Sequence, residues 1–205
     1  MRAVIVMVLI AAAAFFVLFS PWTNNAIAFF PLMTATAFLL AAGSLVLQRK
    51  QAANIYMFKP VFIPIGILAA AVLYVMFWVG HFVSTHILPF AASQVDSIYT
   101  IRAGQNPWLI AGLLLFIIGP AEEIFWRGFV QKRLSKCYGT LFGLIIATAI
   151  YALVHVWSFN LMLLAASALC GIFWGFMFAL TKNLWPCIIC HALWDVTIFI
   201  LLPIQ

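Results

Sequence analysis

The chain has 205 residues, of which 67% are hydrophobic and 7% are charged, and its formal net charge is +6. This composition leaves too little polar surface to coat a water-soluble globule of this size, so it excludes the soluble globular class and predicts an integral membrane protein. Nucleic-acid binding is not expected either, because the Lys and Arg residues cluster between apolar runs, as topology signals do.

Three apolar runs make up the first part of the chain. Residues 3–20 follow Arg2 and are longer than the apolar region of a usual signal peptide, so we interpret them as an uncleaved first span. Residues 26–47 and 61–88 are the second and third spans, and residues 48–59 form a polar loop between them. The amino-terminal part of the chain is therefore expected to cross the bilayer three times.

The second part starts with residues 91–106, the longest polar stretch of the chain. A fourth helix begins near Trp108, with Pro107 suited to its first turn, and ends in a basic amphipathic segment. The remaining spans are residues 141–156, 161–180 and 185–202. The prediction is one all-α transmembrane domain over residues 1–205, a polytopic helical bundle of about seven to eight spans, with a catalytic core at approximately 107–205.

The basic residues between the runs predict the orientation. Alternation through seven spans places these residues on one side: Arg2, Arg49, Lys50, Lys59, Lys132, Arg133, Lys136 and Lys182. Because Lys and Arg are enriched in cytoplasmic loops, the amino end is expected to be cytoplasmic and the carboxyl end outside. A broken helix in the long third run would add a span and reverse one end.

Two adjacent carboxylates stand inside the apolar fourth helix. A charge at membrane depth costs at least a few kcal/mol, so the presence of Glu122 and Glu123 in this helix needs an explanation. Glu123 and Arg127 are four residues apart on one helical face and are expected to form a structural ion pair, whereas Glu122 lies about 100° round the helix. Glu122 is therefore the carboxylate left free to act.

Other titratable residues of the apolar spans are expected at a similar depth. At 1.5 Å per residue, Glu122, His155, His191 and Asp195 all lie roughly 10 to 20 Å from the basic end of their helices. His191 and Asp195, at i and i+4, face the same way. The four side chains are predicted to form one buried polar site on the fourth, fifth and seventh helices, reached more easily from the cytoplasm.

Such a site suits the hydrolysis of a peptide bond. A carboxylate in a low dielectric is a stronger base than in water, and a nearby imidazole can share the proton, so Glu122 with His155 can activate water. His191 and Asp195 can bind the oxyanion of the amide under attack. No serine in an activating arrangement and no HExxH pair competes for this role.

The motifs resemble those of the CPBP family, which comprises type II CAAX prenyl endopeptidases and bacteriocin-processing enzymes, also called ABI proteins. The resemblance rests on Glu122-Glu123-x-x-x-Arg127, Tyr151-x-x-x-His155 and His191-x-x-x-Asp195, in that order on separate apolar runs. It covers about residue 107 to the end of the chain. The first three spans show no family motif.

The resemblance implies a glutamic intramembrane protease. It makes Glu122 the base, His155 its partner, Glu123 with Arg127 the structural pair, and His191 with Asp195 the oxyanion side. Tyr151 stands where the family often has Phe, and Asp195 where the best-known eukaryotic-type members have Asn. Since an ionised Asp cannot donate to an oxyanion, Asp195 must be protonated or must orient His191.

Alternatives to this interpretation remain. Zinc is the mechanistic runner-up, because Glu and two His can ligate it, although no cofactor is expected. A non-catalytic immunity or accessory protein, in which the polar cluster binds a peptide or fixes helix packing, is the rival class. Cys187-x-x-Cys190-His191 has the form of a c-type haem site but opens an apolar span, and His81 and His86 are interpreted as packing or interfacial residues.

The expected partners are the lipid bilayer and a membrane-associated peptide or protein tail. The family resemblance allows prenylated tails, peptide precursors or carboxyl-terminal anchors as substrates. The short loops favour a prokaryotic inner (plasma) membrane. The tryptophans and phenylalanines are expected mostly to face lipid or the interface and to bind no cofactor.

Overall fold

The computed structural model of the protein describes residues 1–24, 28–48 and 53–204. Within these ranges the chain forms helices joined by short turns and contains no strand. In the described part of the chain, six helical segments are long and apolar enough to cross a membrane, and a seventh, shorter apolar segment is Trp185–Leu201. The predicted polytopic all-α bundle is therefore confirmed, and the third run is one continuous helix, Phe62–Ile87.

The helices follow the apolar runs closely. The amino-terminal helices are α1 (Arg2–Phe19), α2 (Phe29–Gln48), the 3-10 turn η2 (Ala53–Tyr56), α3 (Phe62–Ile87), α4 (Ala91–Tyr99) and the 3-10 turn η3 (Thr100–Arg102). The fourth span runs from Pro107 to Tyr138 through α5 (Pro107–Leu113), η4 (Leu114–Ile118), α6 (Gly119–Phe125), η5 (Trp126–Gln131) and α7 (Lys132–Tyr138). The last helices are α8 (Thr140–Leu153), η6 (Val156–Ser158), α9 (Leu161–Thr181), α10 (Trp185–Val196) and η7 (Thr197–Leu201).

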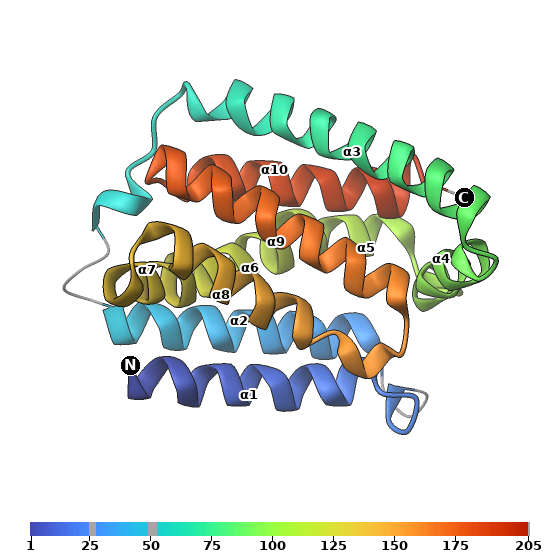
Figure 1. The fold of residues 1–205 in the computed structure, drawn as a ribbon, viewed down its shortest axis with the longest axis horizontal. Helices are drawn as coiled ribbons and strands as arrows, with labels where there is room; N and C mark the ends of the chain where they lie inside the picture. The colour runs from blue at the N-terminus through green and yellow to red at the C-terminus, as the bar shows by residue number, and fades with distance from the viewer. Residues whose placement is uncertain (25–27, 49–52, 205) are drawn as a thin grey trace.

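The helices lie side by side and mostly antiparallel, with the amino terminus at one end of the bundle and the carboxyl terminus at the other (Figure 1). α3 packs on α10, α8 on α9, and α1 on α2, while α6 lies between α2 and α10. The outer helices present apolar side chains to the surroundings, for example Leu9, Leu39 and Leu68, each more than half exposed. Such a surface is suited to lipid, so the protein is an integral membrane protein.

The fourth span contains the least regular helix. Asn106 caps its start by accepting hydrogen bonds from the backbone N–H groups of Trp108 and Leu109. Further along, Pro120 has no N–H to donate to the carbonyl of Phe116, and the preceding turn, η4, is π-helical. A second π-helical stretch, η5, follows α6. The short α6 is thus bracketed by two wide turns, an arrangement often found at functional sites.

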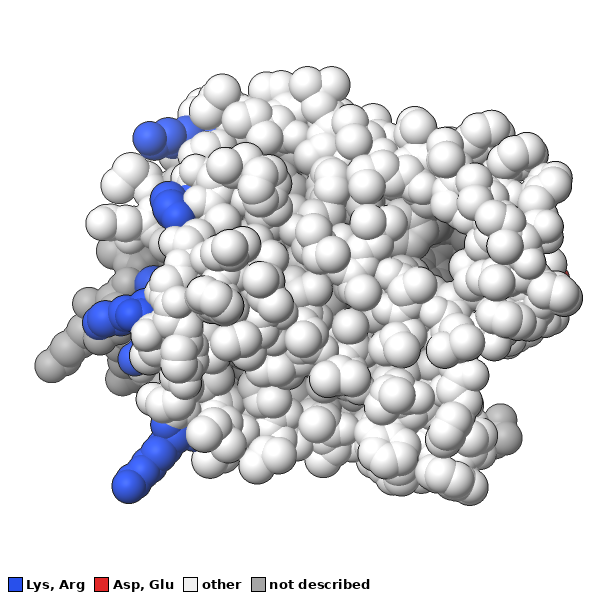
Figure 2. All heavy atoms as spheres, in the orientation of Figure 1, with Lys and Arg blue, Asp and Glu red and all other residues white. Residues whose placement is uncertain are grey.

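The exposed basic side chains of the face drawn in Figure 2 gather at one end of the bundle. That end holds the start of α1, the segment before α3, α7 and the end of α9, as Figure 1 shows, and these segments carry Arg2, Lys59, Lys132 and Lys182. The prediction that the basic residues lie on one side of the bundle is therefore confirmed for these positions. Arg49 and Lys50 lie outside the described residues. We call this the basic end, and the end with α4 the opposite end.

Glycine allows two helices to meet closely at the basic end. A Cβ on Gly143 would lie 2.3 Å from the backbone N of Ser135 and 2.4 Å from its Cα. Because the obstacle is backbone, Gly143→Ala is expected to force α7 and α8 apart and to lower the free energy of unfolding by about 1–3 kcal/mol. Thermal unfolding in detergent measures this change.

Gly112→Ala is the matched control for that substitution. Gly112 is also helical, but nothing lies within 4 Å of the Cβ it would gain. Since Ala favours helix over Gly by about 0.5–1 kcal/mol, this variant is expected to unfold at the wild-type temperature or above it. Equal unfolding temperatures for the two variants would contradict the close packing of α7 on α8.

Candidate active site

Glu122 and Glu123 lie in α6, at the middle of the bundle, and both are buried, with 7% and 0% of their surface exposed. The ion pair expected from their spacing is present, since the Arg127 guanidinium donates to Glu123 Oε1 at 2.8 Å. The guanidinium also lies over the ring of Tyr151, 4.7 Å from its centroid, and over that of Trp174, at 5.1 Å. Arg127 is therefore held on several sides, and its charge is matched by that of Glu123.

His191 of α10 is the centre of the cluster. Its Nδ1 is 2.8 Å from Glu123 Oε1, and its Nε2 is 3.7 Å from Glu122 Oε2 and 3.4 Å from Asp195 Oδ2. A carboxylate oxygen only accepts, so Nδ1 carries a hydrogen and donates it to Glu123. One imidazole thus joins both glutamates, which sequence reasoning missed because it treated Glu123 as the partner of Arg127 alone.

The approach of α10 to α6 depends on a small residue. A Cβ on Gly119 would lie 3.1 Å from Cα of Ala192, so the two backbones are close to contact at this level. Ala192 directly follows His191 in the chain, and Gly119 is one helical turn before Glu123. The close approach therefore brings the imidazole within reach of both glutamates.

Trp174 of α9 fixes the plane of the imidazole. Its ring stacks on His191 with 3.7 Å between centroids and 16° between planes, and it is fully buried. The indole itself is oriented by a hydrogen bond from Nε1 to the Sγ of Cys190 at 3.3 Å. The expectation that tryptophans mostly face lipid is wrong for Trp174; the available signal was its helical spacing from the small residues Ser167 and Gly171 on one face of α9.

Glu122 has a different environment from Glu123. Its Oε1 accepts a hydrogen bond from Trp126 Nε1 at 3.4 Å, and its other oxygen faces His191. Within the described part of the chain no Lys or Arg pairs with Glu122. It is therefore the carboxylate of the pair that is not neutralised by a cation, as its position round the helix predicted.

His155 lies in the turn between α8 and η6 and stands apart from this cluster. Its Nδ1 lies 2.9 Å from the carbonyl oxygen of Tyr151, which can only accept, so Nδ1 is the donor and Nε2 is left free. Its ring packs against Phe15 and Phe19, each with 5.1 Å between centroids. Among the described residues no hydrogen bond joins His155 to Glu122. The structure thus brings Glu122, His191 and Asp195 together and leaves His155 at a separate wall.

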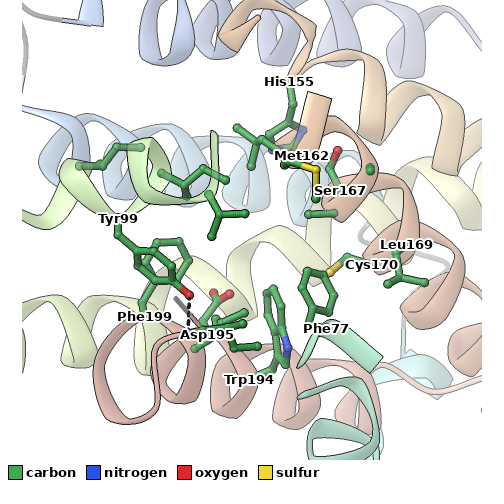
Figure 3. A pocket seen from close by; sticks show the side chains of 18 of the residues that line it. Phe77, Tyr99, His155, Met162, Ser167, Leu169, Cys170, Trp194, Asp195 and Phe199 are labelled. Atoms are coloured by element: carbon green, nitrogen blue, oxygen red, sulfur yellow. Dashed lines mark hydrogen bonds between the residues drawn. The ribbon is translucent and has the colours of Figure 1, made fainter. Parts of the chain in front are cut away.

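A cavity of about 440 Å³ connects these groups. Glu122, His155, His191 and Asp195 all line it, together with many apolar side chains. Figure 3 shows His155 and Asp195 on opposite walls of the cavity. Tyr99 lines the cavity as well; burial raises the pKa of its hydroxyl, so this wall is uncharged near neutral pH. The cavity can hold a water molecule and an extended peptide segment beside Glu122.

The cavity extends toward the opposite end and not toward the basic end. Its lining includes Phe19 and Phe29 at the α1–α2 connection, Leu88 after α3, and Met162 at the start of α9. The cavity therefore opens away from the basic end, which we expected to face the cytoplasm and to give access to the site. The reason is packing, because large side chains toward the basic end, such as Phe129 and Leu184, are fully buried and do not line the cavity.

The ligand types of the cluster raise the question of a metal ion. In residues 1–24, 28–48 and 53–204 no group of three or more His, Cys, Asp or Glu side chains is arranged to hold one. His191 already uses Nδ1 for Glu123, which leaves Nε2 as its one open nitrogen. Cys187 and Cys190 are free thiols, fully buried beside Trp174.

The fold and this centre define a polytopic membrane protein with a carboxylate and imidazole site enclosed by its helices. Residues 104–197 match the family model described as type II CAAX prenyl endopeptidase Rce1-like, and all six of the site residues singled out in the sequence lie within the match. This segment is similar to the Rce1-like domain, in agreement with the resemblance to the CPBP family. The family indicates an intramembrane protease of the CAAX type. No curated protein and no solved structure matches the chain.

Proposed function

We propose that the protein hydrolyses a peptide bond of a membrane-associated peptide or protein inside the bilayer, with Glu122 as the general base. The observation that supports this proposal is the position of Glu122: buried, unpaired with any described Lys or Arg, and at the wall of a cavity large enough for a peptide and water. A positioned base contributes about 10²–10⁴-fold to such a reaction.

The proposed reaction takes place between the two walls of the cavity. The oxygen of a water molecule attacks the carbonyl carbon while Glu122 takes a proton from the water. The free Nε2 of His155 shares that proton, by way of a second water where the walls are too far apart for direct contact. The proton then goes to the amide nitrogen as the C–N bond breaks, and the products are a new carboxyl group and a new amine.

In the same proposal His191 binds the oxyanion. The ring carries both of its protons, so that Nδ1 donates to Glu123 and Nε2 is held by Asp195 until the oxyanion forms. Asp195 thereby orients and balances His191 and need not donate to substrate. Trp174 keeps the imidazole in this plane by stacking on it.

The basic residues support an orientation of the protein in the membrane, and the short connections between its spans support a location. We propose that the basic end faces the cytoplasm, so that the amino terminus is cytoplasmic and the carboxyl terminus is outside. The short connections between spans favour the plasma membrane of a prokaryote.

Hydrolysis can be tested with isotopic water. Purified protein in liposomes is incubated with apolar peptides in H₂¹⁸O, and mass spectrometry is expected to find fragments whose new carboxyl group carries one ¹⁸O. Cleavage should persist in the presence of a zinc chelator, because the proposed water activation needs no metal. Loss of cleavage with chelator and its return with zinc would instead favour the zinc mechanism, and no cleavage of any peptide would favour a non-catalytic accessory role.

A further inference from the structure

The cavity has a mouth at the opposite end of the bundle. Its outermost lining residues come from α4 and from the first turns of α9: Val95, Ile98, Met162 and Ala165. Ala165 both lines the cavity and is exposed. The face drawn in Figure 2 is hollowed at a place that, in Figure 1, lies between α9 and α4. The way into the site is therefore beside these two helices.

Among the described residues, the basic half of the bundle contains large, buried side chains. Phe125, Phe129 and Leu184 have at most 1% of their surface exposed and belong to the buried hydrophobic core. On the other side of the site, α9 has the small residues Ala165, Ala166 and Ser167, all of which line the cavity. Because side chains are large in the basic half and small on the other side of the site, the cavity opens toward the opposite end.

The chemistry of the lining limits what can enter. Lys and Arg are absent from the described lining, and the carboxylates Glu122 and Asp195 lie at its inner part. A terminal carboxylate of a peptide would meet two acidic side chains and neither Lys nor Arg, which is unfavourable in a low dielectric. The charged imidazole of the proposed site, His191, already lies between Glu123 and Asp195. An uncharged, apolar stretch within a longer chain is not repelled by the acidic side chains, needs no basic partner and matches the apolar walls.

Given the proposed function, on which this inference rests, we propose that substrate and water reach the site from the side of the membrane opposite the basic residues. The substrate is then an internal apolar segment of an exported or membrane-inserted protein, and not the charged carboxyl terminus of a cytoplasmic one. The route follows from the position of the mouth at Ala165 relative to the basic end. The class follows from the described lining, which is mostly apolar and holds no Lys or Arg.

Native and introduced cysteines can test the route without any catalysis. Cys137 is the exposed cysteine of the described chain and lies at the basic end, in α7. A membrane-impermeant maleimide is applied to sealed right-side-out and inverted vesicles that hold wild-type protein or Cys137→Ser/Ala165→Cys. Labelling of the wild-type protein reports the accessibility of Cys137 at the basic end, and labelling of the double variant reports the accessibility of the cavity mouth. Cys137→Ser alone measures the labelling of the buried cysteines.

The expected result is labelling of the two positions from opposite sides: Ala165→Cys in right-side-out vesicles and Cys137 in inverted ones. Labelling of both from the same side would overturn the proposed route, and so would an Ala165→Cys thiol that reacts only after detergent is added. These outcomes do not depend on cleavage, so failure of the protease proposal in the ¹⁸O assay is distinguishable from failure of the route.

Protection by a peptide tests the class of substrate in the same vesicles. The probe is an acetylated, 12-residue Leu- and Ala-rich peptide, prepared once as the carboxamide and once as the free acid. The carboxamide is expected to protect Ala165→Cys from labelling at a concentration at least threefold lower than the free acid. Ala168→Cys, on the same helix but not on the cavity wall, serves as the control and is expected to show no protection. Equal protection by the two peptides, or better protection by the free acid, would overturn the assignment of an internal segment.

Discussion

Glu122→Gln is expected to lower the rate of peptide hydrolysis by about 10²–10⁴-fold while the protein keeps its fold. The amide has nearly the shape of the carboxylate and can still accept the hydrogen bond from Trp126 Nε1. It cannot take a proton from water, so only the chemical step is lost. The rate of appearance of cleaved fragments, measured at saturating peptide, reports this step.

The matched control for this variant is Asp96→Asn. It makes the same change of carboxylate to amide on an exposed side chain of α4, at the opposite end of the bundle. We expect wild-type cleavage from it, and wild-type unfolding temperatures from both variants. A Glu122→Gln protein that cleaves at the wild-type rate would discard the proposed general base.

The parts of the structure that could be predicted from the sequence are those fixed by local chemistry. Each span was recognisable because a segment that crosses lipid must be apolar over its whole length, and the helices match the predicted runs to within a few residues. The pairing of Glu123 with Arg127 follows from helix geometry alone. The meeting of Glu122, His191 and Asp195 was predicted from depth, since antiparallel helices of known rise place residues at known levels.

Other features depend on how helices rotate and pack, which the sequence of one chain does not state. The contact of Glu123 with His191 and the stack of Trp174 on His191 require particular rotations of α9 and α10. The direction in which the cavity opens depends on which half of the bundle receives the large side chains. Depth alone gave the correct level for the site but not the direction of its entrance, nor the hydrogen bond of His155 to the Tyr151 backbone.

Arg127→Met is expected to lower the free energy of unfolding by about 3–5 kcal/mol. The substitution removes the cation from a fully buried pair and leaves the Glu123 carboxylate with His191 as its one remaining donor, while Oε2 of Glu123 already has no partner among the described residues. An uncompensated charge in a low dielectric is far less favourable than the pair it came from. Thermal unfolding in detergent, followed by circular dichroism, measures the loss.

The double variant Glu123→Gln/Arg127→Met separates the cost of an unpaired charge from loss of packing. It removes both charges and keeps similar volumes, so most of the stability lost in Arg127→Met is expected to return, with a coupling between the two sites of about 0.5–3 kcal/mol. If the losses of the single variants simply added in the double variant, the ion pair would not be what makes Arg127 important. If the double variant instead regains stability but not peptide hydrolysis, Glu123 also contributes to activity. Its carboxylate accepts Nδ1–H of His191 and so fixes the imidazole that faces Glu122.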